Sequence, residues 1–124
     1  MTNPYSSYVK QMDNISSKEE LVVKVFEEIL SNLNIAMYAI EEGDIKTKAE
    51  TITKVTDAIA LLQASLDMEN GGEIAQNLYK LYDFCIEELL KANVSNDKEH
   101  IKNTIEVIQP IYEGFKGALE NLRG

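Results

Sequence analysis

Residues 71–93 read GGEIAQNLYKLYDFCIEELLKAN, and this stretch decides the fold of the chain. Behind the two glycines, apolar side chains recur at steps of three and four residues, which is the spacing along one face of an α-helix. That face consists of Ala75, Leu78, Tyr82, Cys85, Leu89 and Ala92. A helix with one continuous apolar face has to bury it against other elements, so more helices of the same kind are expected.

Three further segments carry the same periodicity, and turn residues separate them. The first helix is expected over residues 17–41 and the second over residues 45–68. The third helix is the opening stretch, which is expected to end near Asn93. Asn96 is expected to cap the fourth helix, which contains Pro110. The apolar pattern continues past this proline without a change of phase, so we expect a kink there and not a helix end.

The connections between these helices are only about three to five residues long, which forces neighbouring helices to run antiparallel. The sequence therefore predicts an all-α fold, an antiparallel up-down-up-down four-helix bundle. Residues 15–124 are expected to form this single domain, and residues 1–14 a short leader. A dimer of two helical hairpins would satisfy the same apolar pattern and remains the alternative architecture.

The charge and the length of the apolar runs restrict the partners of the chain. Its formal net charge is −9, whereas binding to nucleic acid or to an anionic membrane surface requires clustered lysine and arginine. No apolar run approaches the length that spans a bilayer, and the first residues lack the pattern of a signal peptide. We therefore expect a cytoplasmic protein without membrane insertion and without a nucleic-acid partner.

Catalytic and metal-binding patterns are not found. Cys85 is the single cysteine and lies on an apolar face, where a buried hydrophobic role is expected. A di-iron bundle needs two Glu-x-x-His pairs, but the chain has only His100, with Asp97 three residues before it. We expect no metal, no cofactor and no enzymatic activity.

A binding surface remains as the candidate functional feature. Several apolar residues fall outside the inward faces of the helices: Val23, Ile35, Tyr38, Leu61, Tyr79, Phe84 and Leu90. Such residues are either half-covered flank positions or the lining of a groove that receives a partner helix. The leader adds apolar groups that would either belong to a loose tail or cover such a groove as a movable plug. The predicted partner-binding residues are Tyr5, Tyr8, Met12, Ile45, Leu61, Tyr79 and Phe84.

The opening stretch also resembles a family signature. Its Gly-Gly-Glu-Ile-Ala, Asn-Leu, Leu-Tyr-Asp and Ala-Asn groups, with Leu66–Asp67 and the turn at Glu42–Asp44, are similar to the flagellar secretion chaperones of the FliS family. The resemblance implies a cytoplasmic type III export chaperone that binds the C-terminal segment of flagellin, and the apolar faces of the helices predict that the chain is a monomer. It also implies that Tyr8, or alternatively Tyr5, belongs to a plug, and that components of the flagellar export apparatus are further candidate partners. The alternative is a small self-associating or adaptor bundle without a flagellin client.

Overall fold

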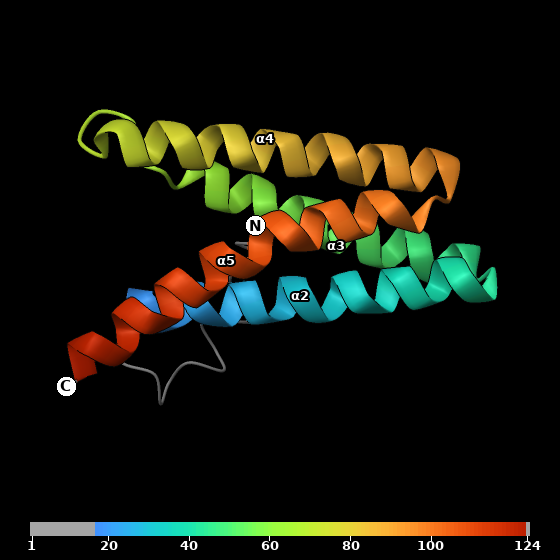
Figure 1. Cartoon of the computed structure of the whole chain (residues 1–124), viewed down its shortest axis with the longest axis horizontal. Coiled ribbons are helices and arrows are strands. Elements are labelled where there is room, and N and C mark those ends of the chain that lie inside the picture. The colour runs from blue at the N-terminus through green and yellow to red at the C-terminus, as the bar shows by residue number, and fades with distance from the viewer. Residues whose placement is uncertain (1–16, 124) are drawn as a thin grey trace, which may run out of the picture.

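The computed structural model describes residues 17–123, which form four helices labelled α2 to α5 (Figure 1). Their bounds are α2 (Lys18–Glu42), α3 (Ile45–Ala64), α4 (Gly72–Ser95) and α5 (Lys98–Arg123). Successive helices run in opposite directions, and each packs mainly against two neighbours in the ring α2–α3–α4–α5. The predicted all-α, antiparallel up-down-up-down bundle is confirmed.

Local hydrogen bonds and backbone conformation explain where α2 begins and ends and where α3 begins. Ser17 caps α2, since its hydroxyl accepts a hydrogen bond from the backbone N–H of Glu20 at 3.2 Å. Gly43 ends α2 with φ of 71°, a left-handed conformation that glycine adopts without steric cost. Asp44 then starts α3, because its Oδ1 accepts the N–H of Thr47 at 3.1 Å.

The expected end of the second helix was wrong, because α3 ends at Ala64 and not near Met68. Beyond that point, two side chains form hydrogen bonds with the nearby backbone and stabilise turns. The hydroxyl of Ser65 donates to the carbonyl of Leu62 at 2.8 Å. Oδ1 of Asp67 accepts the backbone N–H groups of the residues two and three positions later. Such local hydrogen bonds compete with the helical ladder.

The role expected for Asn96 was also wrong, since it ends α4 and does not start α5. Its φ is 58°, and its N–H donates to the carbonyl of Ala92 at 2.9 Å. Asparagine tolerates this left-handed conformation better than most residues do. The start of α5 is instead supported by Asp97, whose Oδ1 accepts the N–H of Glu99 at 2.9 Å.

The predicted inward faces form the core along most of the bundle. Its fully buried side chains include Phe26, Leu33, Ile59, Leu89 and Ile108, and Cys85 is buried among them as predicted. The side chain of Val23 was expected outside the inward faces, but it is buried with 7% of its surface exposed.

The second half of α5 departs from the predicted pattern. The helix continues through Pro110 and changes direction about half-way along its length (Figure 1). Beyond the bend the predicted apolar pattern continues with Phe115 and Leu122, but these side chains are 36% and 71% exposed. A proline inside a helix removes a backbone hydrogen bond and clashes with the preceding turn, which accounts for the bend.

Candidate functional site

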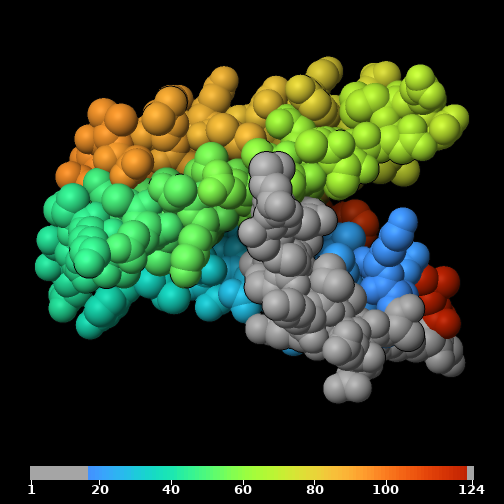
Figure 2. Space-filling view, turned by 180° about the vertical axis from the view of Figure 1, so that it is seen from behind, coloured from blue at the N-terminus to red at the C-terminus, as the bar shows by residue number. Residues whose placement is uncertain are grey.

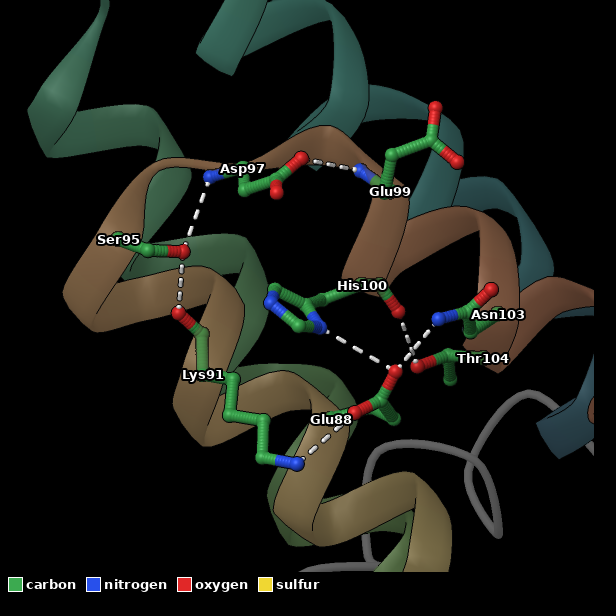
Figure 3. Close-up of polar contacts among 8 residues, drawn as sticks. All are labelled: Glu88, Lys91, Ser95, Asp97, Glu99, His100, Asn103 and Thr104. Atoms are coloured by element: carbon green, nitrogen blue, oxygen red, sulfur yellow. Dashed lines mark hydrogen bonds and ion pairs between the residues drawn. The ribbon is translucent and has the colours of Figure 1, made fainter.

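A buried carboxylate joins α4 to α5 near the end of the bundle where these helices connect (Figure 3). The side chain of Glu88 on α4 is only 5% exposed. Its Oε1 lies 3.2 Å from Nδ1 of His100 and accepts a hydrogen bond from Nδ2 of Asn103 at 2.7 Å. Its Oε2 lies 3.6 Å from Nζ of Lys91. We call these four residues the Glu88 cluster.

The surroundings of Glu88 favour its ionised form. The hydrogen bond from Asn103 lowers the pKa of the Glu88 carboxyl most, and His100 and Lys91 lower it further, while burial acts in the opposite direction. The carboxylate therefore keeps its charge and its bonds to α5 at neutral pH. Glu88 follows Cys85 by three residues and borders the apolar face of α4, and this position was the only sequence signal that it would be buried.

The Glu88 cluster lacks the groups that catalysis or metal binding would need. It holds one histidine, and residues 17–122 contain no group of three or more potential ligands that could hold a metal ion. Burial, with a smaller contribution from Glu88, raises the pKa of the nearby Cys85 thiol to about 12. A thiol in that state is not a nucleophile at neutral pH. The arrangement fastens α4 and α5 together.

A second buried charge fixes the same end of the bundle. Lys48 on α3 is buried, and its Nζ donates to the carbonyl of Asn93 at 2.8 Å and to Oδ1 of Asn96. Asn93 lies in the last turn of α4 and Asn96 directly follows the helix, at the end where the helix dipole favours a cation. Sequence reasoning did not single out Lys48, because a lysine usually lies at the surface.

An apolar hollow of about 250 Å³ lies between α3 and α4. Figure 2 shows the side of the molecule on which these two helices run next to each other. Leu90 borders the hollow and is 65% exposed, so an apolar side chain stands at its edge in solvent. The hollow is lined by Ile52, Thr53, Thr56, Asp57, Ile86, Leu89, Leu90 and Asn93. We call this surface the α3–α4 groove.

Hydrogen bonds between the helices show which other side chains belong to this face. Nε2 of Gln63 on α3 donates to the carbonyl of Tyr79 at 3.1 Å and to Oδ1 of Asp83 at 2.7 Å. The exposed Tyr79 therefore lies along α3, beyond one end of the groove. Ile45 is exposed and precedes Ile52 by seven residues, or two helical turns, so it shares the groove-facing side of α3.

The structure places the other predicted residues on different faces. Phe84 precedes Glu88 by four residues and therefore faces α5, on the opposite flank of α4 from the groove. Leu61 precedes Gln63 by two residues, so it lies roughly 200° around α3 and faces away from α4. Tyr5, Tyr8 and Met12 lie outside the described residues. The groove thus takes in Leu90, which was named among the off-face residues but not among the partner-binding ones.

Among the described residues, no helix has the length and apolar character needed to cross a membrane.

A solved structure described as a flagellar chaperone from bacteria superposes on this chain with a TM-score of 0.77 and 18% sequence identity. The match covers 96% of this chain and 99% of the other, and it independently supports the four-helix fold.

Comparison of the sequence with known proteins identifies its relatives. The flagellar secretion chaperone FliS of Salmonella typhimurium is 38% identical over 102 residues, 82% of this chain and 76% of that relative. The flagellar secretion chaperone FliS of Campylobacter jejuni is 30% identical over 117 residues, 94% of this chain and 91% of that relative. The family model described as flagellar protein FliS matches residues 1–122. FliS proteins are chaperones and not enzymes, in agreement with the sites described above. The chain belongs to the FliS family of flagellar secretion chaperones.

Proposed function

We propose that this chain is a cytoplasmic chaperone that binds the C-terminal segment of flagellin and keeps it unpolymerised before export. Its relatives in Salmonella typhimurium and Campylobacter jejuni are flagellar secretion chaperones, which supports a role in flagellar secretion. The observation that carries the proposal is the α3–α4 groove, an apolar hollow open to solvent on a chain of net charge −9. Such a surface suits a client that would otherwise expose apolar side chains and aggregate.

The groove fits an amphipathic helix of the client. Its apolar lining includes Ile86 and Leu90, which would receive side chains spaced three and four residues apart. Asp57 lines the groove and Asp83 lies farther along the same face, so basic residues flanking the apolar side of the client helix would be favoured. The client segment folds as it binds and loses conformational entropy, so contact over a large area is required.

The leader forms part of the same proposal. Tyr5, Tyr8 and Met12 would cover an apolar groove when no client is bound, as the family resemblance implies. A plug that only competes would weaken client binding, so its removal would raise the affinity. We propose that Tyr8 also contacts the client, because a tyrosine ring supplies a large contact area, and that Tyr8→Ala therefore lowers the affinity.

The decisive experiment is calorimetric titration of the full chain with flagellin monomers that keep or lack the C-terminal segment. We expect one-to-one binding of the intact monomer with a negative heat-capacity change, and no binding of the truncated one. If the intact monomer gives no heat and does not co-elute with the chain, the flagellin assignment is wrong. Size measurement of the chain alone tests the alternative of a self-associating bundle.

A pair of variants locates the binding surface. Leu90→Asp puts a charge at the edge of the α3–α4 groove, and we expect it to weaken flagellin binding at least tenfold without changing the melting temperature. Ile35→Asp is the matched control, because Ile35 is also an exposed aliphatic residue but lies on α2, outside the groove. Equal losses for the two variants would show that the groove is not the client site.

A further inference from the structure

We propose that the second half of α5 is a hinged strap, which opens from α2 as one unit while the first half of the helix stays in place. The strap consists of residues 111–122, and the hinge is Pro110. The proposal concerns the bundle itself and holds whichever client the chain binds. It rests on a difference in attachment between the two halves of one continuous helix.

The first half of α5 is held on both sides. Its Asn103 donates to the buried carboxylate of Glu88 on α4, next to His100. On the other side, Nζ of Lys98 lies 3.3 Å from Oε1 of Glu41 on α2. Between these contacts the inward face is fully buried, at Ile101, Thr104 and Ile108. Opening this half would break the core and the Glu88 cluster together.

Beyond Pro110, two side chains of α5 contact α2. The hydroxyl of Tyr112 donates to Oε2 of Glu27 at 2.8 Å. The ring of Phe115 stacks on that of Phe26, with 5.4 Å between the ring centres. Yet Phe115 remains partly exposed, and Leu119 is the single buried side chain in residues 111–122. Ile111 and Tyr112, in the first turn of the strap, pack partly buried against the core, whereas from residue 113 to residue 122 Leu119 alone is buried.

The packing between the strap and α2 is also incomplete. A hollow of about 200 Å³ that is open to solvent lies between the two, beside the contacts of Tyr112 and Phe115. Its lining from α2 is Glu20, Val23, Lys24 and Glu27, and its lining from the strap is Lys116, Leu119 and Glu120. Five of these seven lining residues are charged, so their head groups can be hydrated when the two surfaces separate.

The backbone at and after the hinge is poorly suited to a rigid helix. Pro110 has no N–H to donate to the carbonyl of Glu106. The strap then contains Gly114 and Gly117, and glycine has a lower helix propensity than any residue except proline. A Cβ atom at either glycine would meet nothing within 4 Å, so packing does not require glycine there. These features lower the stability of the strap without loosening the first half.

Opening of the strap would uncover Phe26, which is fully buried in the closed bundle, and Val23 beside it. Both lie in the first three turns of α2, close to Ser17, where residues 1–16 join the described chain. The open state would present new apolar surface at the end of the bundle where α2 begins.

Amide hydrogen exchange of the full chain, resolved by residue, tests the strap. We expect residues 112–122 to exchange at similar rates and faster than residues 98–109, with a step at Pro110. Tyr112→Phe removes the bond to Glu27 and keeps the ring. The variant should speed amide exchange of the strap about fivefold, because a net hydrogen-bond contribution near 1 kcal/mol corresponds to that ratio of rates. The exchange rates of residues 98–109 should not change. The double variant Gly114→Ala, Gly117→Ala should slow exchange of the strap about thirtyfold, the ratio for roughly 1 kcal/mol at each position.

Lys102→Ala is the control, because it removes an exposed ion pair with Glu99 in the first half of α5. It should leave exchange of the strap unaltered. Rates that rise smoothly from residue 98 to residue 122, as in ordinary fraying, would overturn the proposal. So would a Tyr112→Phe variant that speeds both halves of α5 equally, or a double alanine variant that leaves the strap unchanged.

Discussion

Glu88 and His100 meet across the α4–α5 interface, with Oε1 of the carboxylate 3.2 Å from Nδ1 of the imidazole. The same oxygen accepts a hydrogen bond from the side-chain amide of Asn103. One buried atom therefore joins two successive turns of α5 to α4 (Figure 3). Buried polar groups stabilise a fold when their partners satisfy them, and they specify one packing of the helices.

Replacement of Glu88 by Gln should make stability depend less on pH. Because the pKa of Glu88 is lowered in the folded state, its carboxylate adds stability above the pKa of an unfolded glutamate, about 4.3. That contribution is lost as the pH falls through the lower, folded pKa. Urea unfolding should therefore show the variant less stable than the parent chain at pH 7 and nearly equal to it at pH 2.

Glu87→Gln is the control for this pH effect, because Glu87 is the exposed neighbour of Glu88 on the same helix turn. It removes the same charge from the chain without touching α5. If both variants lose the same stability at pH 7, the contacts of Glu88 with His100 and Asn103 do not hold the helices together.

Lys48→Met should destabilise the bundle by about 1–3 kcal/mol, the cost of leaving buried hydrogen-bonding groups without a partner. The methionine keeps an unbranched side chain that is one atom shorter, and it cannot donate to Asn93 and Asn96. Lys46→Met on the exposed side of α3 should change stability by less than about 0.5 kcal/mol, as surface substitutions do. Urea unfolding of the two variants measures the difference. Similar losses would contradict a structural role for the buried lysine.

Replacement of a core side chain by alanine should lower the free energy of unfolding more where the side chain is fully buried. Ile59 is fully buried, so Ile59→Ala should destabilise by about 2–5 kcal/mol through lost apolar contact and the cavity left behind. Leu78 is only partly buried on the same core, and Leu78→Ala should cost less. Thermal and urea unfolding measure which variant loses more stability. A larger loss for Leu78→Ala than for Ile59→Ala would mean that Leu78 is covered more completely in solution than in this structure.

Cys85 should react slowly with thiol reagents in the native protein. Its side chain is fully buried, and burial raises the pKa of the thiol to about 12, so few thiolates form near neutral pH. The labelling rate should rise steeply in denaturant as the bundle unfolds. If the native chain were labelled at the rate of a free thiol, Cys85 could not face the core, and the orientation of α4 about its own axis would be wrong.

The helices could be predicted from the sequence because their signals are local. The spacing from Ala75 to Ala92 identifies one helical face without reference to any other part of the chain. The Gly43–Asp44 turn was predicted correctly for the same reason. At Ala64 the prediction failed, since hydrogen bonds of Ser65 and Asp67 with the nearby backbone competed with an apolar pattern that continues to Leu66.

By itself, then, the sequence determined four amphipathic helices, their antiparallel order and the burial of Cys85, because helical periodicity and short connections leave few other arrangements. Only the tertiary structure decided which exposed residues share a face. Tyr79 and Leu90 lie on the side of α4 next to α3, whereas Phe84 shares the side of Glu88 next to α5, and this depends on how each helix is rotated against its neighbours. It also decided that Glu88 and Lys48 are buried. A charged side chain enters an interior only where partners such as Asn103 or Asn93 meet it, and those partners come from other parts of the chain.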